Sequence, residues 1–179
     1  QMTEAKQYRR RFGIQGRYQV QLKRKLRFDS YLSIQHQNYP TQAHRDGLFV
    51  DGRLGLAHAI NSSTKISFAV PFEYETTHRP HLNHTKFGVT FGIEKMWRGG
   101  LYSALTLSHS VDNFHGFFPG TSVVRKDKVA KIGVAFRHSK ITIGKYAPEI
   151  SYSYTKSRSN VGFYNFESHD FGLGMSMAF

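Results

Sequence analysis

The sequence predicts an all-β protein, and more specifically an antiparallel transmembrane β-barrel of the outer-membrane type. Three observations favour this fold. Aromatic residues make up 15% of the 179 residues, which is typical of chains that are rich in strands and that place aromatic side chains at a membrane–water interface. The mean hydropathy is −0.48, and no apolar run is long enough for a membrane helix, yet many segments alternate between apolar and polar residues. The connections between these segments alternate between short and long.

Residues 11–20 show the alternation of the first predicted strand. Phe12, Ile14 and Tyr18 fall on one face, whereas Arg11 and Arg17 fall on the other, because side chains along a strand point to opposite sides in turn. Similar alternation continues along the chain and predicts about nine strands in total. The other predicted strands are 26–35, 50–60, 65–75, 86–94, 101–110, 125–138, an eighth ending near residue 158, and 170–179.

Pro148 marks a change of phase in the eighth predicted strand. The apolar positions on either side of this proline do not keep to one face. A proline also lacks the N–H group that a central strand donates to its neighbour. We therefore expect a β-bulge near Pro148.

The last predicted strand carries a pattern that resembles the C-terminal signal by which outer-membrane barrels are recognised for insertion. A polar residue is followed by glycine and then by alternating apolar residues that end on an aromatic one. The positions concerned are Asp170, Gly172, Met175, Met177 and Phe179. The polar side of this strand would face a lumen, and its apolar side would face lipid.

The connections predict which end of the barrel faces outwards. Short turns are expected at 23–25, 61–64, 97–100 and 138–140, and longer loops at 40–47, 76–84, 111–124 and 159–168. Outer-membrane barrels have short periplasmic turns and long extracellular loops. An odd number of strands places the two termini on opposite sides, although single-chain bacterial barrels have even strand numbers. Residues 1–179 are therefore either a single barrel domain whose strands are miscounted or the C-terminal part of a larger barrel, and we favour the second interpretation.

The formal charge of +13 falls largely on positions predicted to face inwards. The candidate lumen charges are Arg11, Arg17, Arg27, Arg53, Glu73 and Glu94. One interpretation is a hydrated lumen in which these charges pair with one another. The other is an electropositive passage that attracts anionic or acidic cargo. Binding of nucleic acid is disfavoured, because the basic residues are spread over many strands and do not gather with aromatic residues in one groove.

Neither a metal site nor an enzyme is predicted. His78, His81 and His84 form the densest histidine group, but no carboxylate accompanies them within that segment and the chain has no cysteine. We interpret them as exposed loop residues, and we expect no cofactor. Barrel lipases often place a His-x-Ser pair on one strand face, whereas Ser108 and His109 are adjacent and point to opposite faces.

The last third of the chain resembles a known family. The motif positions are Arg125, Asp127, Gly144, Pro148, Ser159 and Asn160, followed by an aromatic pair and the terminal strand. Their order is similar to the end of the barrel in the surface lipoprotein assembly modifier (Slam) family. The similarity covers residues 125–179; upstream, only general barrel patterning is shared.

The resemblance implies protein translocation rather than catalysis. Members combine a fourteen-strand barrel in the bacterial outer membrane with a periplasmic helical-repeat domain. They help lipoproteins, and in some cases haem-binding proteins, to cross the membrane. Outer-membrane lipid, the barrel-assembly machinery and the secreted cargo are the implied partners. This chain contains no helical-repeat segment and too few strands for the whole barrel. A small self-contained barrel that acts as a porin or as a ligand or adhesion module is the alternative.

Overall fold

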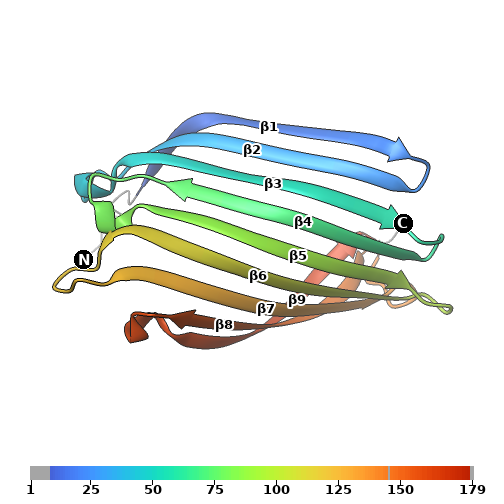
Figure 1. Ribbon diagram of the computed structural model, residues 1–179. Helices are drawn as coiled ribbons and strands as arrows, with labels where there is room; N and C mark the ends of the chain where they lie inside the picture. The colour runs from blue at the N-terminus through green and yellow to red at the C-terminus, as the bar shows by residue number, and fades with distance from the viewer. Residues whose placement is uncertain (1–8, 145, 178–179) are drawn as a thin grey trace, which may run out of the picture.

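The computed structural model describes residues 9–144 and 146–177, which form one antiparallel sheet (Figure 1). The described residues contain no α-helix and three short 3-10 turns, η1 (Ala43–Arg45), η2 (Pro80–Leu82) and η3 (Gly162–Tyr164). The strands are β1 (Arg10–Lys23), β2 (Leu26–Asn38), β3 (Gly47–Ala59), β4 (Thr64–Glu75), β5 (His84–Met96), β6 (Leu101–Phe117), β7 (Val124–His138), β8 (Tyr146–Ser159) and β9 (Phe166–Met177). Within this part of the chain, no helix is long and apolar enough to cross a membrane.

The nine strands follow one another in sequence order, and each pairs with the next. The prediction of an all-β chain with about nine antiparallel strands is therefore confirmed. No pairing of β1 with β9 is found among the described residues, so the sheet is curved but open (Figure 1). Within the described residues these strands thus do not close into a barrel by themselves, and their place in a larger barrel stays a prediction.

The connections lie at two distinct ends of the sheet. The longer ones, residues 39–46, 76–83, 118–123 and 160–165, lie at one end, which we call the loop end. Those at the opposite end, residues 24–25, 60–63, 97–100 and 139–144, are mostly tight turns. The last of these is longer than the predicted turn at 138–140. β1 starts at the loop end and β9 finishes at the other end, as an odd number of strands requires.

The predicted loop at 111–124 is wrong, because β6 continues to Phe117 before it turns. Asp112 still pairs with Asp127, and Asn113 pairs with Lys126, before the register shifts towards Phe117. The alternation rule misses this extension because Phe114 faces inwards with the polar residues. Its ring lies against the imidazole of His84 and under the guanidinium of Arg125, so the aromatic residue serves an interaction on the inner face.

The bulge expected at Pro148 is also wrong. Pro148 pairs with Met175 in the same unbroken register as the rest of β8 and β9, and the β7–β8 register is regular too. The last pair between β7 and β8 joins Arg137 to Glu149, so the missing N–H of Pro148 lies beyond that ladder. In the turn before β8, Gly144 adopts a positive φ of 63°, which glycine tolerates without strain.

The two faces of the sheet are inverted relative to those of a water-soluble protein. Large apolar side chains on the outer face are exposed, with Phe12 85% and Leu173 88% accessible. The buried polar or charged residues, by contrast, lie on the inner face: Ser33, Gln37, Asp127 and Ser157. Because an exposed apolar surface of this extent is unfavourable in water, the outer face requires an apolar environment.

Candidate functional site

The inner face of β1, β2 and β3 carries a group of arginines that we call the arginine groove. Arg17, Arg27 and Arg53 line a depression of about 380 Å³ together with Asp29 and Tyr31. Cross-strand pairing explains their proximity, because Arg17 lies opposite Tyr31, and Tyr31 lies opposite Arg53. No ion pair joins these arginines to a carboxylate within the described residues. Their donors are therefore available to an anionic ligand.

Glycine makes room for the carboxylate in this groove. A Cβ atom on Gly55 would lie 2.7 Å from an oxygen of Asp29, which is closer than packing allows. The glycine thus lets Asp29 lie flat against β3 between the arginines. With one carboxylate among three guanidinium groups, the groove keeps a net positive charge, and a concave polar surface of this kind attracts anionic groups.

Other charges on the inner face are engaged. Lys65 and Glu94 lie opposite each other on β4 and β5, and their charged groups are 2.7 Å apart. The guanidinium of Arg11 lies 4.9 Å from the ring centre of Phe49. The expectation that lumen charges pair with one another therefore holds for Glu94 and not for the arginines of the groove, within the part of the chain that is described.

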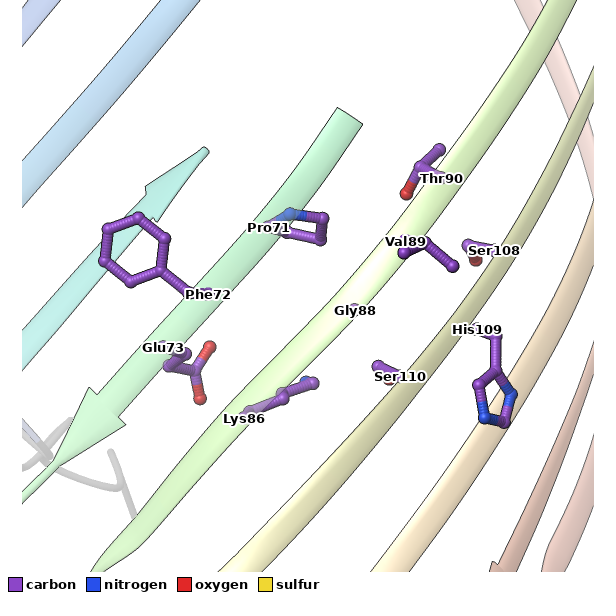
Figure 2. A pocket seen from close by; sticks show the side chains of 10 residues that line it. All are labelled: Pro71, Phe72, Glu73, Lys86, Gly88, Val89, Thr90, Ser108, His109 and Ser110. Carbon is purple, nitrogen blue, oxygen red and sulfur yellow. The ribbon is translucent and has the colours of Figure 1, made fainter. Parts of the chain in front are cut away.

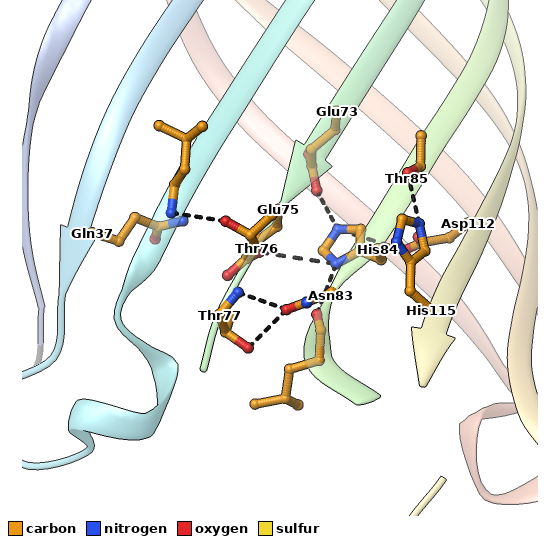
Figure 3. Close-up of polar contacts among 12 residues, drawn as sticks. Gln37, Glu73, Glu75, Thr76, Thr77, Asn83, His84, Thr85, Asp112 and His115 are labelled. Atoms are coloured by element: carbon orange, nitrogen blue, oxygen red, sulfur yellow. Dashed lines mark hydrogen bonds and ion pairs between the residues drawn. The ribbon is translucent and has the colours of Figure 1, made fainter. Parts of the chain in front are cut away.

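A second polar group lies at the loop end, where β4, β5 and β6 meet. We call Glu73, Glu75, His84 and Asp112 the rim cluster (Figure 3). Nε2 of His84 lies 2.9 Å from Oε1 of Glu73 and 3.9 Å from Oδ2 of Asp112. Nδ1 of His84 lies 4.0 Å from Oε2 of Glu75. The four side chains are largely withdrawn from solvent, with the imidazole only 11% exposed.

The position of His84 corrects the sequence interpretation. His84 is the first residue of β5 and not an exposed loop residue. The carboxylates that its own segment lacks come from β4 and β6, because His84 pairs with Glu75 and its neighbour Lys86 pairs with both Glu73 and Asp112. A hairpin closed by the 76–83 loop pairs Glu75 with His84, and counting the residues on either side of this loop in the sequence could have predicted part of the cluster.

Between these two regions, the inner face has a hollow of about 240 Å³ (Figure 2). It forms where Pro71 lies beside Gly88 and where Ser108 and Ser110 are small. Ser108 and Ser110 alternate along β6 with His109, so the serines and the imidazole do not converge. The close-up accordingly shows no nucleophile with a histidine base, and the hollow is a gap between short side chains.

The family-motif residues Arg125 and Asp127 meet at the loop end of β7. The guanidinium makes a two-pronged ion pair with the Asp127 carboxylate and also lies 4.3 Å from the ring centre of Phe114 and 3.2 Å from that of Tyr164. We call this arrangement the Arg125 clamp. It joins β6, β7 and the η3 loop around one buried charge pair, with the Asp127 side chain only 9% exposed.

The other motif residues occupy the same end or the opposite one. Asn160 accepts a hydrogen bond from the Lys126 N–H and donates one to the Val124 carbonyl, at 2.7 and 2.8 Å. The Ser159 hydroxyl accepts a bond from the Val161 N–H. Gly144 and Pro148, by contrast, lie at the short-turn end. The six motif positions therefore do not form one site.

The residues of the predicted insertion signal lie along β9. Asp170 and Gly172 lie on the inner face, opposite Ser153 and Ser151, and Met175 is exposed on the outer face. The backbone of Met177 pairs with Tyr146. Phe179 lies outside the described residues. A role of these positions in insertion stays a prediction.

His44, His78 and His81 lie in the two loops that contain η1 and η2, at the same end of the sheet as the rim cluster. The Nδ1 atom of His78 lies 3.1 Å from the Ala43 carbonyl, which brings the η1 and η2 loops together. Desolvation, reinforced by the positive charges of Arg79 and Arg45, lowers the pKa of His44. The lowered pKa favours the neutral form of this histidine.

The sequence matches one known protein family. The family model described as "Surface lipoprotein assembly modifier" matches residues 1–179, which is the whole chain. Comparison with curated proteins and with solved structures finds no match. The family is associated with the outer membrane and with transport and assembly rather than with known enzymes. The chain therefore belongs to the surface lipoprotein assembly modifier family, which implies a role in the assembly of surface lipoproteins.

Proposed function

We propose that this chain forms part of an outer-membrane β-barrel that assists the export or surface display of lipoproteins or haem-binding proteins. The observation that carries the proposal is the inverted partition of the sheet. Apolar side chains such as Phe171 and Leu173 are exposed on the outer face, whereas polar residues such as Ser33 and Gln37 are buried on the inner one. A strand that alternates in this way faces lipid on one side and a polar interior on the other.

The proposed mechanism is passive and needs no cofactor. Cargo with acidic or otherwise anionic segments approaches the inner face, where the unpaired guanidinium groups of the arginine groove attract it. Arginine suits this role because its fork of donors binds carboxylates in two-pronged fashion and keeps its charge at any physiological pH.

The two outer strands offer a second way to guide cargo. β1 and β9 each pair with only one neighbour among the described residues. An unpaired strand edge binds another extended segment through main-chain hydrogen bonds. These edges would pair with further barrel strands or transiently with cargo at a seam. A periplasmic helical-repeat domain and the barrel-assembly machinery are the proposed partners on the inner side of the membrane.

A surface-display assay tests the proposal. The full-length protein is produced in a Gram-negative host together with a lipoprotein carrying an epitope tag, and antibody labelling of intact and of lysed cells is compared. We expect the labelled fraction on intact cells to fall when the protein is omitted. An equal surface fraction with and without the protein, at equal lipoprotein levels, would contradict the proposed function.

Insertion is tested separately from cargo handling through Phe179. We expect Phe179→Ala to lower the amount of folded protein in the outer membrane, because it alters the terminal residue of the predicted insertion signal. Display per folded molecule should stay unchanged. Normal levels of folded protein in this variant would show that the signal has been misassigned.

A further inference from the structure

The rim cluster poses a problem of hydrogen bonding that the proposed function does not address. One imidazole, that of His84, lies among three carboxylates from two neighbouring strands. A carboxylate accepts hydrogen bonds and donates none. Among the described residues, the imidazole of His84 lies within 4.0 Å of all three carboxylates, and Lys86 and Arg11 add positive charge nearby.

The backbone decides which nitrogen of His84 carries the proton. Nδ1 lies 3.3 Å from the Leu82 carbonyl oxygen, which can only accept. A neutral imidazole that donates from Nδ1 has a lone pair on Nε2. This is the arrangement in which a second ring nitrogen is oriented for metal binding, because ligating histidines generally donate their other N–H to a carbonyl or carboxylate.

Nε2 then points at two acceptors. Glu73 lies 2.9 Å away and Asp112 lies 3.9 Å away. A proton on Nε2 satisfies Glu73 but leaves Asp112 beyond hydrogen-bonding distance. In addition, Oδ1 of Asp112 is completely buried and has no hydrogen-bond partner within the described residues. A buried unpaired carboxylate oxygen is costly, so one proton does not resolve the cluster.

We propose that the rim cluster binds a divalent transition-metal ion through His84 and carboxylate oxygens of Glu73, Glu75 and Asp112, with Nε2 of His84 facing Glu73 and Asp112. One ligand atom from each of Glu73, Glu75 and His84 already lies within 4.8 Å of the others. Tetrahedral Zn²⁺, with bonds of about 2.0–2.2 Å, needs separations of roughly 3.3 Å. Rotation of the carboxylates covers this difference. A mixed set of one imidazole and several carboxylates suits Zn²⁺ better than Ca²⁺ or Mg²⁺, which prefer oxygen alone.

Nearby positive charges reduce the charge of the site without occupying it. Lys86 lies on β5 between Glu73 and Asp112, and Arg11 and Arg45 also influence the acidic groups. Asp127, the next carboxylate along the same cross-strand row, is held by Arg125 and is not counted as a ligand. A bound ion would tie β4, β5 and β6 together directly below the η2 loop, and so hold the mouth of the sheet in one shape.

Zinc binding and X-ray absorption by the purified full-length protein test this proposal. The protein is stripped with chelator in detergent micelles and titrated with Zn²⁺, and the zinc absorption edge is then analysed for its ligands. We expect a site of one ion per chain with a single imidazole and otherwise oxygen ligands. Absence of such a site, or a site with two or more imidazoles, overturns the proposal, since several imidazoles indicate the loop histidines.

Matched variants locate the site. We expect His84→Gln and Glu73→Gln to weaken Zn²⁺ binding by at least about tenfold. The double variant His78→Gln/His81→Gln, which removes two loop histidines, should bind as the unmodified protein does. The reverse pattern overturns the proposal. Strand content from circular dichroism confirms that each variant is folded, and the absorption measurement on the unmodified protein decides the question even where a variant is not.

Discussion

The arginine groove and the Arg125 clamp lie on the same inner face but differ in how their charges are satisfied. In the groove, Arg17, Arg27 and Arg53 surround a single carboxylate without forming ion pairs among the described residues. At the loop end, Arg125 forms an ion pair with Asp127 and lies against two aromatic rings. One region thus has unused binding capacity, whereas the other has used its charges for cohesion.

Burial explains the difference. Hydrated guanidinium groups can stay unpaired in an open groove, since water screens and solvates them. The Asp127 side chain is only 9% exposed, so its charge requires a partner within the protein. The open groove is therefore the region to which we assign the proposed attraction of anionic cargo, whereas the clamp holds neighbouring segments of the loop end together. Four predictions test this difference, and they follow in order of decreasing expected effect.

The largest effect is expected from Arg125→Leu. This change leaves the Asp127 carboxylate buried without its partner, which costs about 3 kcal/mol of stability. The unfolding midpoint in detergent, followed by the heat-dependent mobility of the folded protein on gels, should fall clearly. Arg125→Lys keeps the charge but loses the forked geometry, so its unfolding midpoint should lie between those of the unmodified protein and of Arg125→Leu. An unchanged midpoint in Arg125→Leu would mean that the loop end does not depend on the clamp.

The next effect concerns the arginine groove. We expect the triple variant Arg17→Gln/Arg27→Gln/Arg53→Gln to display lipoprotein at a rate lower by roughly tenfold, because the attracting field is lost. Its unfolding midpoint should stay close to that of the unmodified protein. The display assay on intact cells measures the first quantity and gel mobility measures the second.

The matched control removes the same net charge elsewhere. In Lys65→Gln/Lys95→Gln/Lys156→Gln, two of the lysines are already engaged by Glu94 and Glu167, and the third lies against Trp97. Display should be almost unaffected. Equal losses in both triple variants would show that overall charge matters and not the groove.

A smaller effect is expected from Asn160→Ala. The variant loses two hydrogen bonds, to the Lys126 N–H and to the Val124 carbonyl, which together contribute about 1–2 kcal/mol in this exposed position. The same unfolding measurement should show a modest decrease. Asn160→Asp retains the acceptor and should recover part of the loss. No difference between the two variants would mean that the acceptor contributes nothing.

The smallest effect is expected from Lys65→Gln. The pair of Lys65 and Glu94 is 38% and 37% exposed, so solvent screens it and its contribution to stability is less than about 1 kcal/mol. High salt should reduce the difference between the variant and the unmodified protein further. A large loss of stability here would contradict the idea that cohesion is concentrated at the loop end.

The strands and the side chains on each of their two faces could be predicted from the sequence alone. Residues such as Phe12 and Arg11 alternate with period two, and that period is a local property of the extended chain, so it can be read without knowing the neighbours. The last third of the chain also carried enough of the motif around Arg125 and Asn160 to indicate the family. The sequence predicted too early an end for β6, because the apolar Phe114 lies on the polar inner face and so breaks the alternation. There it contacts side chains of neighbouring strands.

The contacts between side chains of different strands, by contrast, became known from the three-dimensional structure. His84 and Asp112 are distant in sequence, and their proximity depends on the register between β5 and β6, which local alternation does not specify. The same holds for Arg125, whose partners Phe114 and Tyr164 come from a neighbouring strand and a loop. Pairing across strands is set by the lengths of the turns and by the order of the strands, and these nonlocal quantities brought the rim cluster together.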